Sequence, residues 1–210
     1  MSDLLPLFPL PNVVLFPNVF LPLHIFEPRY REMVSDALQA DRLIGMVLLR
    51  PGWESSYEGC PPVYAIGCSG VITHVERLDD GRFNIVLRGM ERFRIVEEER
   101  SRLYRRAMVE PLPECGLTPG DRDVVRHQRA KLESLLAPAV GTSENDPRTT
   151  AAMSDEDLVN ALAQYLGLEP LEKQALIEQG SLRRRAESLV ELLEMKIMMA
   201  RTPGLSNVAH

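Results

Sequence analysis

One short segment carries the residue types of a catalytic nucleophile. It reads Gly67, Cys68, Ser69, Gly70 and Val71. In a nucleophile elbow the serine stands in the pattern Gly-x-Ser-x-Gly, because its sharp turn needs glycine on both sides. Val71 occupies the place of the last glycine, so the pattern is incomplete. The sequence therefore predicts a serine in a strand bend rather than an acyl-transfer nucleophile.

Other residues that could do chemistry lack the spacing that chemistry needs. No glycine is followed by lysine, so the phosphate-binding loop GxxxxGK[ST] is missing. The histidines form no HExxH, and the cysteines form no CxxC pair. We therefore expect no metal site and no cofactor, and we expect reduced thiols in a cytoplasmic protein. The residues concerned are His24, His74, His127, His210, Cys60, Cys68 and Cys115.

Charge and hydropathy exclude two further classes of function. The net charge is −6, of which −2 falls in residues 1–110 and −4 in residues 111–210, so neither part offers the basic face that phosphate binding requires. Nucleic acid is therefore not expected as a partner. No uninterrupted apolar run reaches the roughly 18 residues of a membrane span, so no membrane contact is expected either. The arginines at 100–106 follow Glu97, Glu98 and Glu99, which predicts a self-compensated segment.

The elements that position these residues begin with a proline-rich stretch over 4–30. A proline inside a helix costs about 3 kcal/mol, so a stretch with a proline every few residues is extended. Proline also breaks a central ladder, which leaves short strands at edges and corners. We expect two strands and the corner between them, with Asn12 and Asn18 as turn residues. The prolines are Pro6, Pro9, Pro11, Pro17, Pro22 and Pro28.

The segments that follow predict a small barrel. A helix over 27–39 and a buried strand over 43–49 precede a loop at 50–62, which contains the only tryptophan. Four more strand patterns occur before Pro111, with an Asp-Gly hairpin turn at 79–81 and a break at Arg88, Gly89 and Met90. The count is about six strands and one helix. The strand patterns are 63–66 with 71–78, 83–87, 93–96 and 104–109.

Beyond Pro113 the apolar residues recur at helical spacing. Ser154 begins one helix with a cap to Asp157, and Gly167 and Gly180 end the second and the third. The expected domains are a β-barrel over 1–112, a small all-helical domain over 113–203 and a flexible tail over 204–210. The fold class is therefore α+β. The expected helices are 121–137, 154–167, 170–180 and 181–201, with a linker over 138–150.

Two segments carry a family resemblance. The run PLFPLPNVVLFPNVFLPLHIFEPRY, followed by IGCSGVITHVERLDDGRFNIVLRGMERFRI, resembles the N-terminal domain of the ATP-dependent Lon proteases. The resemblance covers residues 4–112 well and the helical remainder more loosely. It implies a PUA-like pseudo-barrel, in a free-standing form. The ATPase and Ser/Lys peptidase parts of a Lon protease have no counterpart here, so no enzymatic activity is carried over.

The resemblance implies binding of polypeptides in an extended or partly unfolded state. Such recognition needs exposed apolar and aromatic anchors on a rigid frame, often beside an open strand edge. The first candidates are Trp53 and Tyr57 in the loop, and the second are Phe26, Arg29 and Tyr30 at the strand-to-helix corner. The alternative is that Phe26 and Tyr30 belong to the core and that the loop folds on its own ring.

Three function classes stay open on these grounds, besides a purely structural or assembly role. The first is a non-catalytic polypeptide-binding module, such as an adaptor or a chaperone-like factor that works with a protease or chaperone. The second is an RNA-binding module, because PUA-like barrels elsewhere bind RNA, although the acidic balance opposes it. The third is an enzyme whose motif the sequence does not display.

Overall fold

The proline-rich opening forms two short strands, as its spacing predicts. They are β1 (Leu5–Leu10) and β2 (Phe20–Ile25) in the computed structural model, which describes residues 4–57, 59–114, 116–140 and 153–201. The register explains how β1 tolerates proline. Pro6 pairs only with β6, and Pro9 pairs only with β3, so each has a strand on one side alone. Successive residues point opposite ways, so each missing N–H can face the side without a partner.

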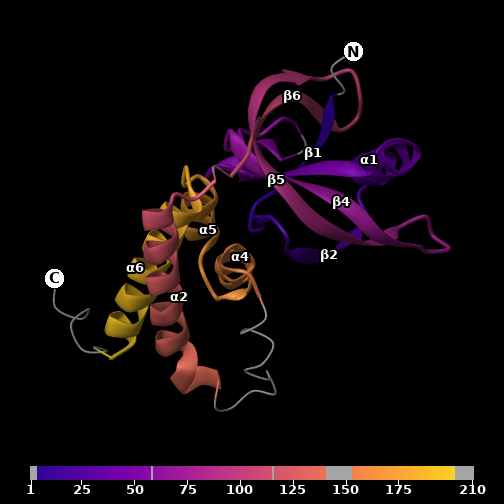
Figure 1. The fold of residues 1–210 in the computed structure, drawn as a ribbon. Coiled ribbons are helices and arrows are strands. Elements are labelled where there is room, and N and C mark those ends of the chain that lie inside the picture. The colour runs from indigo at the N-terminus through magenta and orange to yellow at the C-terminus, as the bar shows by residue number, and fades with distance from the viewer. Residues whose placement is uncertain (1–3, 58, 115, 141–152, 202–210) are drawn as a thin grey trace. The chain divides into compact units, whose positions relative to one another are not determined.

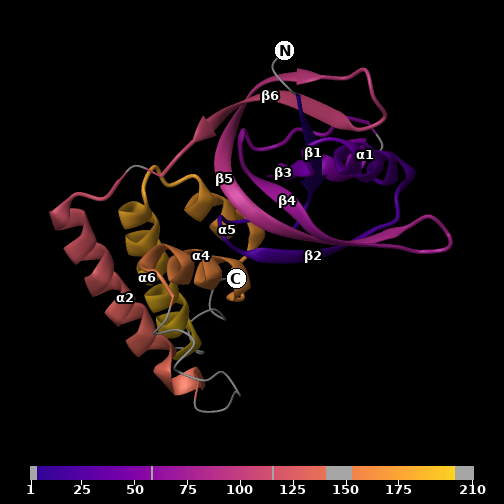
Figure 2. The same cartoon turned by 45° about the vertical axis from the view of Figure 1, so that its right-hand side comes forward.

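The strands close into a barrel through the longest of them. Their order is β2-β5-β4-β3-β1-β6, and β5 also pairs with β6. The 17 residues of β5 pair with β4, β2 and β6 in turn, as its long curve in Figure 2 shows. The predicted α+β class with six strands is confirmed. The remaining strands are β3 (Leu43–Leu48), β4 (Ile66–Arg77), β5 (Phe83–Glu99) and β6 (Arg105–Leu112).

The strand break predicted at Arg88, Gly89 and Met90 is wrong, because all three residues lie inside β5. Gly89 serves a close approach instead of ending the strand. A Cβ atom at this position would lie 1.9 Å from the carbonyl oxygen of Phe16. The same approach lets the amide of Gly89 donate to Val19 and the amide of Asn18 donate to Gly89, at 2.8 and 2.9 Å. Asn18 adopts a φ of 61°, as a turn residue does.

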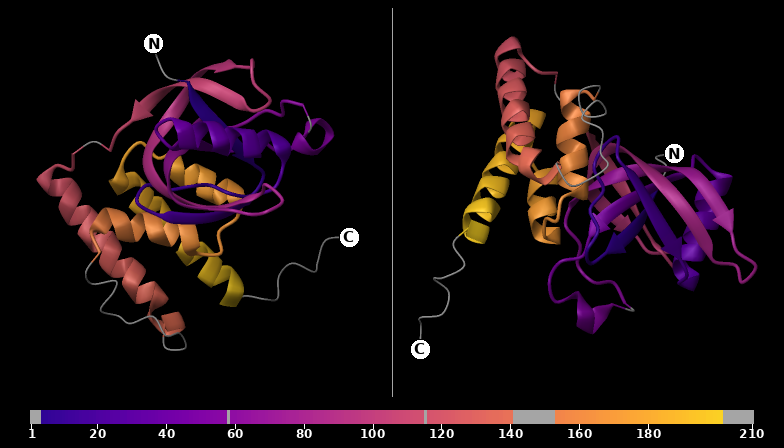
Figure 3. Two further views of the ribbon diagram at one scale, coloured as in Figure 1. Left: turned by 90° about the vertical axis from the view of Figure 1, so that its right-hand side faces the viewer. Right: turned by 90° about the horizontal axis from the view of Figure 1, so that it is seen from below.

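Alternation along the strands produces two apolar clusters. Ile44 and Met46 of β3 face the larger cluster, and Leu43 and Val47 face the smaller one with Phe93. Helix α1 (Pro28–Gln39) supplies buried side chains to the larger cluster, each worth about 1.5 to 3 kcal/mol when it is a large apolar one. The left panel of Figure 3 shows the strands curved into a ring beside α1.

The helical remainder begins and ends close to the predicted positions. Pro170 opens α5, and Ser154 caps α4 by accepting the amide of Asp157 at 3.1 Å. The predicted tail at 204–210 and most of the predicted linker lie outside the described residues. A short 3-10 turn, η1 (Trp53–Ser56), lies in the loop over 50–62. The helices are α2 (Pro119–Val140), α4 (Asp155–Tyr165), α5 (Pro170–Ile177) and α6 (Leu182–Arg201).

The chain divides into two compact units whose bounds differ from the expected domain boundary at 112. Residues 1–113 form one unit with 160–178, and residues 114–159 form the other with 179–210. Most of α4 and all of α5 thus belong with the barrel. Besides a contact of Tyr165 described below, three polar contacts hold them there: Gln164 accepts the amide of Phe16, Gln174 donates to the carbonyl of Ile66, and Arg92 donates to the carbonyl of Ile177.

The second unit is held by helix packing and ion pairs. Helices α2 and α6 lie side by side (Figure 1), and Val125, Leu132 and Leu189 are fully buried. Arg185 is buried and pairs with Glu114, while Lys131 pairs with Glu194 at 2.8 Å. A buried pair loses several kcal/mol when one partner is removed, so the Glu114–Arg185 contact fixes where α6 begins relative to residue 114.

The close approach at Gly89 yields a prediction about stability. Gly89→Ala should lower the free energy of unfolding by about 3 kcal/mol, because overpacking against backbone cannot be relieved by a side-chain rotation. Urea unfolding followed by circular dichroism measures this loss. Gly120→Ala is the control, since a Cβ there meets nothing within 4 Å. Equal midpoints for the two variants would contradict the assigned approach.

Candidate functional site

An aromatic clasp fastens the loop over 50–62 to the start of α1. The guanidinium of Arg29 lies 4.6 Å from the ring centre of Tyr30 and 4.9 Å from that of Tyr57. Arg29 also pairs with Glu27 at 2.9 Å and donates to the carbonyl of Tyr57 at 3.3 Å. The Tyr57 hydroxyl donates to the second carboxylate oxygen of Glu27 at 2.5 Å. We call Glu27, Arg29, Tyr30, Trp53 and Tyr57 the clasp.

The clasp brings together four of the five residues predicted as polypeptide anchors. The Trp53 ring meets the Tyr57 ring edge-on, with centres 5.3 Å apart. Tyr30 is only 4% exposed and contacts Phe8 at 4.5 Å between ring centres, so it lies in the core rather than on the surface. Burial raises the pKa of Tyr57, and the hydrogen bond to Glu27 raises it further. The Tyr57 phenol therefore stays neutral and donates its hydrogen bond to the Glu27 carboxylate.

Phe26 lies apart from the clasp. Its side chain is 59% exposed, so the alternative that placed Phe26 in the core is wrong. The ring stacks on His24 with centres 6.2 Å apart, and His24 in turn contacts Asn84 and Arg82. These are contacts of the β2–β5 surface.

A cleft of about 700 Å³ opens between the end of α1 and strands β1, β3, β4, β5 and β6. This is within the range of roughly 300–1,000 Å³ that ligand sites occupy. Its apolar floor comes from side chains of the smaller cluster, and its rim is charged. The lining residues used below are Leu5, Leu43, Phe93, Val109, Pro111, Asp36, Asp41, Ser69, Glu91, Arg102, Tyr104 and Arg106.

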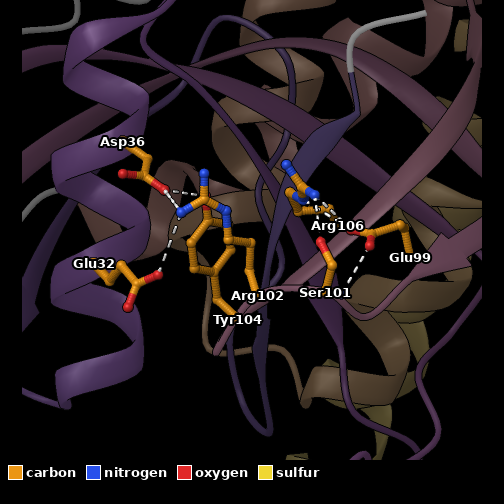
Figure 4. A network of polar contacts seen from close by, with 7 residues as sticks. All are labelled: Glu32, Asp36, Glu99, Ser101, Arg102, Tyr104 and Arg106. Atoms are coloured by element: carbon orange, nitrogen blue, oxygen red, sulfur yellow. Dashed lines mark hydrogen bonds and ion pairs between the residues drawn. The ribbon is translucent and has the colours of Figure 1, made fainter.

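A polar network forms one wall of the cleft (Figure 4). The guanidinium of Arg102 lies 3.8 Å from Glu32 and 3.6 Å from Asp36, both on α1. The Tyr104 hydroxyl donates to Asp36 at 2.7 Å. Burial raises the pKa of Tyr104 to about 12, with a further contribution from the Asp36 carboxylate. The network ties the start of β6 to α1.

A second pair completes this wall. Arg106 contacts Glu99 at 2.7 Å and the Ser101 hydroxyl at 2.9 Å (Figure 4). Arg105 precedes Arg106 in β6 and points to the opposite face, where it pairs with Glu98 at 2.6 Å. Arg105 and Arg106 are therefore compensated by preceding glutamates, as the sequence predicts, whereas Arg102 pairs with acids of α1 instead.

Ser69 lines the cleft but is bound to backbone. Its hydroxyl donates to the carbonyl of Glu91 at 3.1 Å, and the amide of Glu91 approaches the same oxygen at 3.4 Å. The register of β4 and β5 shifts between Cys68 and Gly70, so Ser69 fills the place of a regular backbone pair at this bulge. The predicted structural role of Ser69 agrees with this geometry. Within the described ranges, no group of three or more His, Cys, Asp or Glu could hold a metal ion.

The outer edge of the sheet is poorly suited to pairing with another strand. Among the described strands β2 has β5 as its one neighbour. The Tyr165 hydroxyl donates to the carbonyl of Phe20 at 2.8 Å, which places that carbonyl on the outer side of β2. Backbone groups two residues apart point the same way, so Pro22 offers no donor on this side. Recognition of an extended chain here has to rely on side chains.

The sequence could not reveal the cleft. Its lining comes from six elements whose proximity follows from strand register and from the position of α1. The one signal in the sequence is a carboxylate two residues from an apolar side chain, which occurs at Asp41 with Leu43 and at Glu91 with Phe93. Glu91 and Phe93 share a face because both lie in β5. Asp41 lies in the turn before β3, where the φ of Arg42 is 64°, so its position depends on that turn.

The architecture is that of a Lon N-terminal domain. The N-terminal domain of the Mycobacterium avium complex Lon protease matches with a TM-score of 0.71 and 16% identity, over 91% of this chain and 98% of that one. A Lon N-terminal domain protein from Xanthomonas campestris matches with a TM-score of 0.60 and 24% identity, over 90% of this chain and 98% of that one. At these identities the likeness shows the fold alone.

Sequence similarity then assigns the family. Residues 4–195 match the model of the ATP-dependent protease La (LON) substrate-binding domain, so the chain belongs to this family, as the proline-spaced opening predicts. The Lon protease of Syntrophus aciditrophicus is 26% identical over 94% of this chain, and Lon protease 2 of Desulfotalea psychrophila is 27% identical over 99%. The chain spans only 26% and 27% of the length of these relatives. None of the helices described here is long and apolar enough to span a membrane.

The clasp generates a prediction about local stability. Tyr57→Phe removes a hydrogen bond to a carboxylate, which contributes about 1 kcal/mol or more. We expect the amides of residues 50–62 to exchange hydrogen about fivefold to tenfold faster. Tyr64→Phe is the matched control, because the Tyr64 hydroxyl has no hydrogen bond to another described residue. Equal exchange in the two variants would show that the hydroxyl does not hold the loop.

The network at Asp36 generates a prediction about pH. Because the pKa of Tyr104 is about 12 in the folded chain and 10.0 ordinarily, its contribution to stability is complete below pH 10 and is lost as pH rises toward 12. Asp36→Asn should lower the pKa of Tyr104, and Asp41→Asn should not. Tyrosinate absorbance, with Tyr104→Phe subtracted to isolate the group, measures both. An unchanged pKa in Asp36→Asn would contradict the role of this carboxylate.

Proposed function

We propose that this chain binds polypeptide segments in an extended or unfolded state and catalyses no reaction on them. The observation that carries the proposal is the cleft, which combines an apolar floor with a charged rim on one face of a closed barrel. The family to which the chain belongs is described as a substrate-binding domain, and the relatives are proteases, whose substrates are polypeptides. The proposed role is that of an adaptor or chaperone-like factor in the cytoplasm, acting with a protease or chaperone.

The shape of the cleft suits side-chain recognition. An unfolded chain exposes apolar side chains that a folded protein buries, and each gains free energy by leaving water. Leu43 and Val109 are half-buried and offer apolar surface at the floor, which rests on the buried ring of Phe93. Strand addition at β2 is opposed by Pro22 and by the contact of Tyr165 with Phe20. The cleft is therefore the surface to which the proposal assigns capture.

The predicted anchors take different parts in this proposal. Trp53 is partly exposed and stays a proposed contact, as does the exposed ring of Phe26. Arg29 and Tyr57 are engaged with Glu27, so they hold the loop that carries Trp53. Tyr30 supports them from the core.

Capture of a permanently unfolded protein tests the proposal. A reduced and alkylated model protein with a fluorescent label should bind this chain, and its native form should not. Val109→Thr should weaken capture about fivefold, because a hydroxyl in the floor is desolvated without a partner when a client covers it. Val96→Thr is the control, since Val96 is 58% exposed on β5 and does not line the cleft.

Three outcomes would contradict the proposal. The first is no difference between the unfolded and the native form, and the second is equal affinity of the two valine variants. The third is displacement of the bound protein by RNA with a steep dependence on salt, which would favour the RNA-binding alternative instead. Capture that persists at moderate salt and in the presence of RNA supports polypeptide binding.

A further inference from the structure

The rim of the cleft carries a charge imbalance. Arg102 is paired with Glu32 and Asp36, and Arg106 is paired with Glu99. The cations of the rim are thus already neutralised by acids of α1 and β5. Asp41 and Glu91 also line the cleft, and no cation pairs with either carboxylate among the described residues. A segment that enters the cleft therefore meets two uncompensated negative charges.

These two carboxylates stand beside the apolar floor. Asp41 lies two residues before Leu43, and Glu91 lies two residues before Phe93, and all four line the cleft. The Asp41 side chain accepts the amide of Leu43 at 3.0 Å, which holds this carboxylate at the start of β3. Glu91 is fixed through its backbone by Ser69, at 3.1 Å and 3.4 Å. When a client side chain lies on the floor, the neighbouring residues of the client therefore lie near Asp41 or Glu91.

The geometry points to a preference, resting on the proposed function, for extended segments in which Lys or Arg stands next to apolar side chains. The apolar side chain covers Leu43 or Val109, and the cationic side chain reaches Asp41 or Glu91. An acidic residue at the same place is opposed by both carboxylates and finds Arg102 and Arg106 already paired. Like-charge contacts of this kind set specificity more than overall affinity.

Three labelled peptides that differ at one position test the preference. They share one apolar sequence and carry Lys, Gln or Glu at its centre, and fluorescence anisotropy with the full chain gives their affinities. At low salt we expect the Lys peptide to bind about tenfold tighter than the Glu peptide, with the Gln peptide between them. Each exposed charge contributes little free energy, but the peptide meets both Asp41 and Glu91. Salt should reduce the difference, because these charges are exposed.

Matched variants locate the effect. Asp41→Asn with Glu91→Gln should reduce the difference between the Lys and Glu peptides at least threefold. Asp79→Asn with Glu97→Gln removes the same number of charges from exposed positions outside the cleft and should leave the difference unchanged. Equal affinity of the three peptides, or a difference that survives in the cleft variant, would overturn the preference.

The outcomes separate this inference from the proposed function. If the unfolded model protein is captured but the peptides show no charge order, the preference fails and the proposed function stands. If nothing unfolded is captured, both fail. Self-association of the chain that disappears in the cleft variant would assign the cleft to a second copy and would also overturn the inference.

Discussion

A strand can contain proline only where the missing backbone donor faces no neighbouring strand, and the barrel is organised around this constraint. Pro6 and Pro9 lie in β1 at positions with one neighbouring strand, whereas Leu7 between them pairs with both β6 and β3. Pro22 lies in β2, which has one neighbour along its whole length. The staggered pairing of β1 follows, since β6 covers its first half and β3 its second.

The stagger has a consequence for the surface. Strand β6 pairs with β1 along one edge and with β5 along the other, and Arg106 and Ala107 pair with both strands, which closes the barrel. The cleft lies where β1, β6 and the end of α1 meet, with its floor on the smaller apolar cluster. Strand β6 takes part in both the closure and the cleft, and most residues that line the cleft lie on strands or on α1. Rigid elements lower the entropic cost of binding.

The elements could be predicted from the sequence, because proline spacing, helical periodicity and the Asp-Gly turn at 79–81 are local signals. The break predicted at Arg88–Met90 is wrong because Gly89 packs closely against the carbonyl of Phe16, which is distant in the sequence. Local pattern could not distinguish these two uses of glycine. Four residues of the clasp were singled out from the sequence, but their mutual contacts were not. The stacking of Arg29 on Tyr30 and Tyr57 depends on the path of the loop. The cleft needed the strand register.

The attachment of α4 and α5 to the barrel bears on how such a domain can diverge. Gln164 and Gln174 contact a main-chain amide and a main-chain carbonyl of the barrel, and Arg92 contacts a main-chain carbonyl of α5. Every residue type presents a main-chain carbonyl, and every type except proline presents a main-chain N–H. Substitutions at Phe16, Ile66 or Ile177 can therefore accumulate without loss of the three bonds, provided that the backbone path persists. Each contact therefore restricts only the residue that contributes its side chain. Distant homologues are free to vary the residue that contributes its main-chain group.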